Sequence, residues 1–169
     1  MVGSSTTSGR FFYNWDLKKY RVDRADGKYD RYCGSAYKLT STPCSHYVSE
    51  GKRYLDYPEK NYCCYCCDAA HGCGVLSPDW VKDGTYKGQM SEAGVAYDVW
   101  DKPGLQSNLY WQTTDSKRMF RIDQQPDDVQ TFDVNSFSTQ VDDSVFDLPS
   151  RCSSQNTCSW LSVCTPLRS

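Results

Sequence analysis

The sequence has little of what marks a membrane protein or a nucleic-acid-binding protein. No stretch approaches the roughly 18 apolar residues that a membrane-spanning helix needs, so we expect no transmembrane segment. Charge of neither sign dominates, because 19 Lys and Arg residues stand against 21 Asp and Glu residues and the signs are mixed along the chain. Nucleic acids bind to concentrated positive charge, and we therefore expect no nucleic-acid partner.

Histidine is scarce, and so are the motifs of catalysis. His46 and His71 are the two histidines, and we interpret both as loop or surface residues because neither stands in a nucleophile motif. No glycine-rich phosphate loop or dinucleotide fingerprint occurs. The acidic pairs at 127–128 and 142–143 do not follow the calcium-loop pattern, and turn formation explains them more simply. The sequence thus predicts a protein that is not an enzyme and holds no cofactor.

Cysteine, in contrast, is abundant. Five of the ten cysteines lie within residues 63–73, and the other five flank this cluster on both sides. The full set is Cys33, Cys44, Cys63, Cys64, Cys66, Cys67, Cys73, Cys152, Cys158 and Cys164. An even number at this density is typical of a disulfide framework, which indicates an oxidising compartment and predicts a secreted, extracellular protein.

The spacing inside the cluster limits which cysteines can pair. Neighbouring Cα atoms are about 3.8 Å apart, whereas an ordinary disulfide spans roughly 4.4 to 6.8 Å. We therefore expect no bond between Cys63 and Cys64 or between Cys66 and Cys67. The simplest scheme sends each cluster thiol to one cysteine outside the cluster. In an extended run, Cys63 and Cys67 point to one face, and Cys64 and Cys66 to the other.

A zinc site is the main alternative interpretation of the cluster. Its overlapping C-x-x-C spacings, with His71 and Cys73 close behind, offer ligand types that zinc prefers. Such sites normally use two well-separated ligand pairs, whereas doubled cysteines and five further thiols fit a disulfide framework better, so we expect no metal site. A thioredoxin-like redox site also needs a helix N-terminus in a βαβ setting, which the sequence does not predict.

The first third of the chain predicts one hairpin, followed by a polar and largely irregular segment over residues 34–60. Apolar residues alternate over 11–17 and predict a strand that continues to Asp23. Asp26-Gly27 then favours a hairpin turn, with the chain returning over 29–33. Residues 34–60 are polar and weakly periodic, apart from a candidate strand at 53–57.

The rest of the chain predicts an antiparallel meander. Ser77 followed by Pro78 predicts one short helical turn over 77–81. Five strand-like runs follow, separated by Gly, Pro, Asn and Asp, at 85–90, 95–100, 109–114, 119–124 and 129–134. The predicted fold class is mainly β, with an antiparallel curved sheet or a partly open barrel or sandwich, one or two short helices and disulfide staples. We expect a flexible leader over 1–10, a single β-rich domain over 11–152 and a cysteine-rich tail over 153–169 that packs on this domain.

Aromatic residues are the strongest candidates for a functional site in this sequence. They make up 14% of the chain, and five of them fall on predicted strands that could line a concave sheet. These candidate ligand-binding residues are Trp15, Tyr97, Trp100, Trp111 and Phe120. Aromatic walls suit apolar ligands. The alternative interpretation is that the same residues fill the core.

The order of several short motifs resembles the secreted ependymin-related proteins. The motifs are Tyr-Asn-Trp-Asp at 13–16, Tyr-Arg-Val-Asp at 20–23, Cys33, and Phe-Asp-Leu-Pro at 146–149 followed by Cys152. The resemblance spans residues 11–33 and 85–152. It implies a LolA-like antiparallel sheet, curved around a hydrophobic pocket, in a secreted protein that binds lipids or similar apolar molecules.

Two functional hypotheses follow. The first is a secreted, non-catalytic protein that binds a lipid or another apolar small molecule on an aromatic concave face. The alternative is a structural or adhesive extracellular module that self-associates or contacts the cell surface or matrix, which dense cross-linking and 13 Tyr residues favour.

Overall fold

The computed structural model describes residues 5–37, 41–104, 107–124 and 128–168. The chain forms two compact units. Residues up to 77 together with 141 onward form the first, which we name the disulfide unit, and residues 78–140 form the second, the sheet unit. The boundaries of these compact units do not coincide with those of the leader, single domain and tail expected from the sequence. The division into one domain over 11–152 with a leader and a tail stays a prediction.

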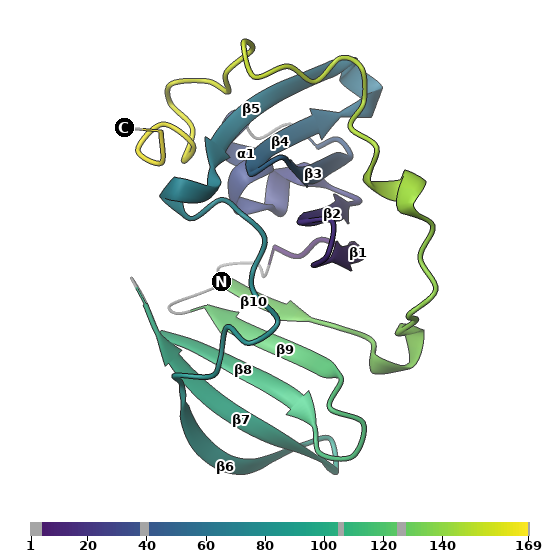
Figure 1. The fold of residues 1–169 in the computed structure, drawn as a ribbon, viewed down its shortest axis with the longest axis vertical. Helices are drawn as coiled ribbons and strands as arrows, with labels where there is room; N and C mark the ends of the chain where they lie inside the picture. The colour runs from purple at the N-terminus through teal and green to yellow at the C-terminus, as the bar shows by residue number, and fades with distance from the viewer. Residues whose placement is uncertain (1–4, 38–40, 105–106, 125–127, 169) are drawn as a thin grey trace. The chain divides into compact units, whose positions relative to one another are not determined.

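The mainly β fold class is confirmed. Over the described residues, each unit contains one five-stranded antiparallel sheet, and each sheet runs from one edge strand to another without closing into a barrel (Figure 1). Helices are few and short: α1 spans Arg31–Ala36, and short 3-10 turns span Gly27–Tyr29, Pro58–Lys60, Ala69–His71, Val134–Ser136 and Asp143–Phe146. No helix in the described parts of the chain is long and apolar enough to cross a membrane.

The sheet of the disulfide unit follows chain order, so each strand pairs with the next (Figure 1). Its strands are β1 Gly9–Asn14, β2 Lys19–Arg24, β3 Cys44–Ser49, β4 Lys52–Tyr57 and β5 Tyr62–Asp68. β1 and β2 form the first hairpin, with Phe11 opposite Val22 and Tyr13 opposite Tyr20. The alternating apolar pattern of residues 11–17 therefore predicted a strand in the right place, although the strand ends at Asn14.

The hairpin predicted at Asp26-Gly27 is wrong. The chain turns earlier because the side-chain Oδ1 of Asn14 accepts a hydrogen bond from Leu17 N at 3.1 Å, and Lys18 takes the left-handed conformation with φ of 52°. Asp26 instead caps the 3-10 turn at Gly27–Tyr29, and Asp30 caps α1. Short acidic side chains favour helix N-caps because they accept hydrogen bonds from the unpaired amides of the first turn.

A strand that the sequence analysis missed lies in the polar segment over residues 34–60, which was expected to be largely irregular. Residues 34–60 contain β3 as well as β4, and β3 lies between β2 and β4 in the sheet. Five consecutive residues of β3, from Cys44 to Val48, are buried. A strand buried on both faces shows no alternation of polar and apolar residues. Because β3 also contains the polar residues Ser45 and His46, its sequence resembles that of a loop.

The cysteine run forms β5, and all ten cysteines are bridged. Three bonds link β5 to the C-terminal tail: Cys63–Cys152, Cys64–Cys158 and Cys66–Cys164. The other two are local: Cys67–Cys73 and Cys33–Cys44. Adjacent cysteines do not pair, as predicted. The expectation that every cluster thiol reaches outside the cluster is wrong for Cys67, because the chain turns back through the 3-10 turn Ala69–His71 and brings Cys73 within reach.

A β-bulge between β4 and β5 changes which cysteines share a face. Arg53 lies opposite Cys67 while Tyr54 lies opposite Tyr65, so Cys66 is the extra residue of the bulge. As a result, Cys67 belongs to the same buried cluster as Cys64 and Cys66 rather than to the side of Cys63. Strict alternation predicted the opposite for Cys67, since it assumed a strand without a bulge.

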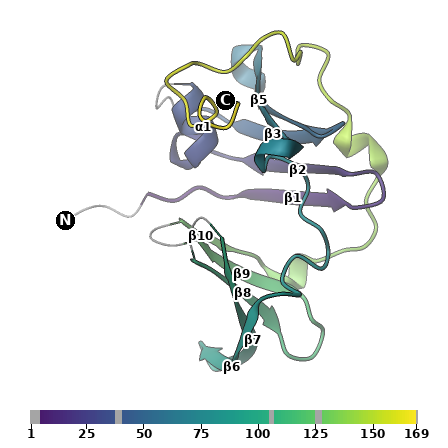
Figure 2. The ribbon, with the colours of Figure 1, turned by 60° about the vertical axis from the view of Figure 1, so that its left-hand side comes forward.

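The core of the disulfide unit is built from cystine sulfur and tyrosine rings. Cys33 and Ala36 of α1 pack against Leu55, Tyr57 and the bridged cysteines of β5. The buried hydroxyl of Tyr57 donates to the carbonyl of Cys33 at 2.7 Å, and burial raises the pKa of this hydroxyl well above its usual range. The tail lies beside α1 and β5 in both views (Figures 1 and 2), where Val163 N donates to Ser35 Oγ at 3.1 Å and Tyr65 bridges to Thr157.

The sheet unit is the predicted antiparallel meander. Its strands are β6 Thr85–Glu92, β7 Val95–Pro103, β8 Ser107–Thr113, β9 Met119–Gln124 and β10 Asp128–Thr131, and each one pairs with the next. All five predicted runs are confirmed, with shifts of a few residues at their ends. The helical turn predicted at 77–81 is not a helix: residues 78–83 form successive hydrogen-bonded turns, with Lys82 N donating to Asp79 O at 2.9 Å.

Candidate functional site

An apolar groove lies on the disulfide unit, where two hairpin turns meet the segment after β5. It encloses about 580 Å³ and is lined mainly by small and apolar residues. Trp15 and Val48 contribute apolar walls, and Ala69, Val75 and Leu76 contribute the opposite side. Small-molecule sites in proteins usually enclose roughly 300 to 1,000 Å³ and are mostly apolar, so the groove has the size and lining of a ligand site.

The groove is fixed in shape by its surroundings. The β3–β4 turn consists of Glu50 and Gly51, both with positive φ (52° and 72°), which is the backbone of a tight two-residue hairpin. The Cys67–Cys73 bond holds the chain after β5, and the Tyr13 hydroxyl donates to Leu76 O at 2.8 Å. The walls are therefore tied together before any ligand binds.

The rim of the groove carries one charge of each sign. Lys18 Nζ lies 3.0 Å from the centroid of the Trp15 ring, a cation–π contact that orients the indole. Glu50 stands on the β3–β4 turn and also lines the groove. The arrangement suits a molecule with an apolar body and a small polar end.

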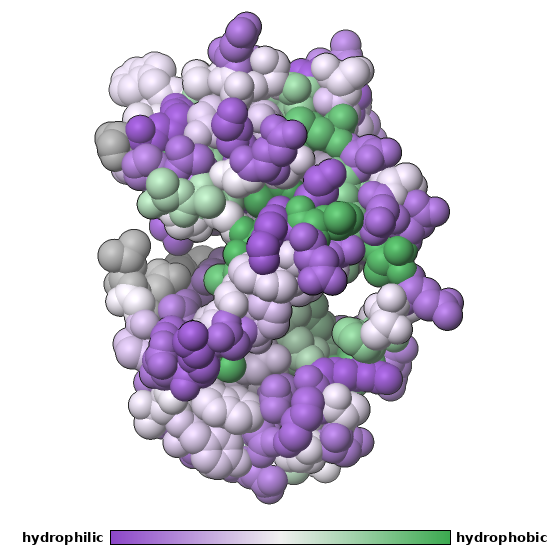
Figure 3. Space-filling view, in the orientation of Figure 1, coloured by the Kyte–Doolittle hydropathy of each residue, from purple (hydrophilic) through white to green (hydrophobic). Residues whose placement is uncertain are grey.

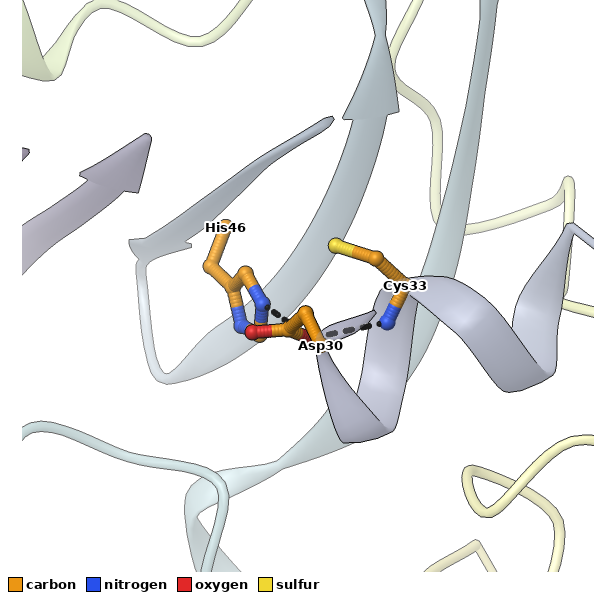
Figure 4. Close-up of side chains that lie close together, drawn as sticks. All are labelled: Asp30, Cys33 and His46. Atoms are coloured by element: carbon orange, nitrogen blue, oxygen red, sulfur yellow. Dashed lines mark hydrogen bonds and ion pairs between the residues drawn. The ribbon is translucent and has the colours of Figure 1, made fainter. Parts of the chain in front are cut away.

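A second candidate site is a buried acid–base pair at the start of α1. Figure 4 shows the Asp30 carboxylate between the His46 ring and the backbone amide of Cys33. His46 Nε2 donates to Asp30 Oδ1 at 2.9 Å, and the same oxygen accepts from Cys33 N at 2.9 Å. Asp30 Oδ2 accepts from Arg24 Nε at 3.1 Å. The prediction that His46 is a loop or surface residue is wrong, because it lies on β3 and its side chain is 6% exposed.

The electrostatics of this pair are those of a structural contact. Burial alone raises the pKa of Asp30, but the charge and hydrogen bond of His46, the amide of Cys33 and the charge of Arg24 outweigh it and hold the pKa well below its usual range. The hydroxyl of Ser45, next to His46 in sequence, donates to Asp23 Oδ1 at 2.8 Å, whereas His46 is paired with Asp30. Asp30 thus stabilises the helix start and joins it to β3.

Two groups among the described residues place three metal-ligating side chains within 4.8 Å: Asp30, Cys33 and His46, and Asp56, Cys63 and Cys152. In both groups the sulfur atoms belong to disulfides, so neither offers the thiolate that zinc binds. Asp56 is also occupied, because Arg151 Nε and Nη2 donate to its two oxygens at 2.6 and 2.7 Å. The disulfide interpretation of the cysteines is confirmed.

His71 lies where the sequence analysis expected it. It is exposed, at the end of a 3-10 turn, and its Nδ1 lies 2.7 Å from Asp68 Oδ1. The hydrogen bond and charge of His71 hold the pKa of Asp68 below its usual value.

Four of the five aromatic candidates lie in the sheet unit. Tyr97 and Trp111 are buried in its core with Val99, and Phe120 packs against them. The rings of Tyr97 and Phe120 stack with centroids 4.0 Å apart. For these three residues the structure supports the alternative interpretation, in which predicted ligand contacts fill the core.

Trp100 and Trp15 lie elsewhere. Trp100 is half-buried, and its ring contacts Tyr86 and Tyr110 rather than the core cluster. Trp15 belongs to the disulfide unit and lines the groove there. Sequence reasoning missed the other groove residues, because glycine and alanine at 69–74 carry no hydrophobic pattern, although two glycines and two alanines in such a short span do indicate a close approach of the backbone.

No protein-family model matches this chain, and no curated protein sequence matches it either. The resemblance to ependymin-related proteins therefore stays a prediction, and the functional argument depends on the residues themselves.

Proposed function

We propose that this chain is a secreted, non-catalytic protein that binds a lipid or another apolar small molecule in the groove beside Trp15. The observation that carries the proposal is the groove itself, about 580 Å³ and mainly apolar, in a unit that five disulfides hold together. A preformed apolar site binds with a smaller ordering cost than a site that must first fold around its ligand. The disulfides support an oxidising compartment, and with it secretion.

Filling the groove tests the proposal. Ala69→Trp places an indole in the space that a ligand would occupy, whereas Ala70→Trp adds the same side chain at the neighbouring exposed position, which does not line the groove. We expect uptake of a fluorescent fatty acid to weaken by about tenfold or more in Ala69→Trp and to be unchanged in Ala70→Trp.

Native mass spectrometry and solvent extraction of the purified protein provide the second measurement. A co-purifying apolar molecule that disappears in Ala69→Trp supports the groove as its site. If no molecule is extracted and no uptake of the fatty acid is measurable, the proposal fails. Equal uptake by the two variants would place the ligand somewhere else.

A second candidate function is self-association or adhesion, and the C-terminal tail favours it. Trp160 and Leu161 are 76% and 60% exposed between the bridged Cys158 and Cys164. In one view, hydrophobic residues appear at the surface as separate patches among hydrophilic ones (Figure 3). Sedimentation over a range of concentrations distinguishes the candidates, because a strict monomer contradicts self-assembly through Trp160.

A further inference from the structure

The sheet unit carries a row of aromatic rings on the face opposite its core. Tyr86, Trp100 and Tyr110 lie on neighbouring strands, because Tyr86 pairs with Trp100 and Trp100 pairs with Tyr110. Ring centroids are 5.1 Å apart for the first pair and 6.2 Å for the second. Trp80, from the turns at 78–83, meets Tyr110 edge-on at 5.5 Å. We name these four residues the aromatic row.

The aromatic row is not part of the core. The core residues of this sheet, Tyr97, Val99 and Trp111, alternate along β7 and β8 with the residues of the row, and neighbouring residues of a strand point to opposite faces. The rings of the row remain partly open to solvent, and Tyr86 is 52% exposed.

Polar side chains flank the row on both sides. In one direction along the strands, past the bulge between Tyr86 and Gly88, the register aligns Gln89, Asp98 and Gln112. In the other direction it aligns Lys102, Asn108 and Gln124. The face therefore consists of an apolar stripe of rings between two rows rich in amide groups. Amides both donate and accept hydrogen bonds.

This combination selects one class of ligand. We propose that the aromatic row binds a neutral oligosaccharide chain that lies across β6, β7 and β8. A sugar ring presents C–H groups on its faces, which are attracted to the negative faces of aromatic rings. Its hydroxyl groups point outward from the rim of the sugar, where the two polar rows supply hydrogen-bonding partners.

Other ligands fit the face less well. A lipid would cover the polar rows without offering hydrogen bonds to the amide and charged groups that face solvent, and removing such groups from water is costly. A nucleic acid needs cations, but Lys117 and Lys102 both have carboxylate neighbours: Lys117 Nζ lies 2.8 Å from Asp98, and Lys102 Nζ lies 3.9 Å from Asp83. A neutral sugar matches both the rings and the amides.

The face is also organised in advance. The Tyr86 hydroxyl donates to Asp98 Oδ1 at 2.9 Å, and Lys117 Nζ donates to Asp98 Oδ2. Asp98 is itself buried on β7, so it anchors the exposed ring of Tyr86 against the ring of Trp100. Side chains held in place lose little freedom on binding.

Calorimetric titration of the full chain tests the proposal, with cellohexaose, laminarihexaose and chitohexaose as the probes. We expect at least one of them to bind, and we expect Trp100→Ala and Tyr86→Ala each to weaken that binding by about tenfold. Two matched controls, Trp160→Ala and Tyr29→Ala, remove exposed aromatic rings from the disulfide unit and should bind as the parent does.

The outcomes are decisive in both directions. Absence of binding to all three hexasaccharides, or parent-like binding by Tyr86→Ala, overturns the proposal. Circular dichroism checks the folding of each variant, and because Tyr86 is exposed, its variant decides the result if Trp100→Ala does not fold. Since the fatty-acid assay with Ala69→Trp concerns another unit, failure of the groove proposal leaves this test unaffected.

Discussion

The two units solve the same problem of stability in different ways. The disulfide unit contains all ten cysteines, and its main buried cluster consists largely of cystines. The sheet unit contains no cysteine, and its described core depends on Tyr97, Val99 and Trp111 with the residues that pack against them. Covalent bonds allow the first unit to keep an open groove and an irregular tail, whereas the second requires a regular meander with matched register.

Reduction of the disulfides should produce the largest difference between the units. Each bridge contributes roughly 2 to 4 kcal/mol, and the five together rival the whole stability of an ordinary domain. After treatment with dithiothreitol, we expect backbone amides of β3 and β4 to lose protection in hydrogen-exchange mass spectrometry, while those of β7 and β8 keep theirs. Equal loss in all four strands would contradict independent stabilisation of the two units.

Replacing Asp30 should produce an intermediate effect that is confined to the disulfide unit. Asp30→Asn keeps an oxygen that can cap α1 but removes the charge that faces His46 and Arg24. Loss of a buried, hydrogen-bonded charge should lower the free energy of unfolding by about 1 to 3 kcal/mol near pH 7, as measured by urea unfolding.

The effect of Asp30→Asn should depend on pH. Folding lowers the pKa of Asp30 from its reference value of 3.8, so the contribution of the carboxylate is complete above that value and declines as the pH falls below it. The difference in stability between the parent and the variant should therefore begin to shrink as the pH falls below about 4 and continue to shrink as the pH falls further. Asp142→Asn, at an exposed cap, is the control and should change the unfolding free energy much less. A constant difference across the pH range would rule out the charge as the cause.

A turn substitution should give the smallest effect, and only in the sheet unit. The β6–β7 turn consists of Ala93 and Gly94, with φ of 51° and 80°. Because Asn tolerates positive φ better than Ala, Ala93→Asn should raise the free energy of unfolding of this unit by about 0.5 kcal/mol.

Ala96→Asn provides the contrast for this turn substitution, since Ala96 is exposed on β7 and Asn is disfavoured in strands. We expect it to lower stability slightly. A gain at Ala96 equal to that at Ala93 would show that the turn conformation is not responsible.

The sheet unit could be predicted from the sequence almost completely, and the disulfide unit only in part. Strands β6 to β10 are short strand-like runs between turn residues, so local pattern is sufficient to place them. In the disulfide unit, β3 is buried on both faces and contains Ser45 and His46, and the bulge at Cys66 has no local signal. The sequence shows that Asp30 is acidic, but its role as a buried ion-pair partner could not be predicted, because only the fold brings His46 and Arg24 close to it.

The candidate sites show the same limit. Trp15 was identified as a ligand residue from alternation, and it does line the groove, but the opposite wall comes from Ala69, Val75 and Leu76, outside any predicted element. Residue type could not separate the core residues Tyr97, Trp111 and Phe120 from Trp100, which lies on the opposite face. Alternation assigns residues to two faces of a strand but does not indicate which face packs in the core. The bulge at the β8–β9 pair further moves Phe120 onto the core side.

The three bonds between β5 and the tail also set an order of events during biosynthesis. Their partners in the tail lie 89, 94 and 98 residues further along the chain than Cys63, Cys64 and Cys66, respectively. At the usual pace of translation, this separation corresponds to roughly 5 to 20 seconds, during which these thiols have no native partner. Cys33–Cys44 and Cys67–Cys73, separated by 11 and 6 residues, can close first. The three bonds between β5 and the tail can therefore form only after the meander has been made, when the tail arrives to close the unit.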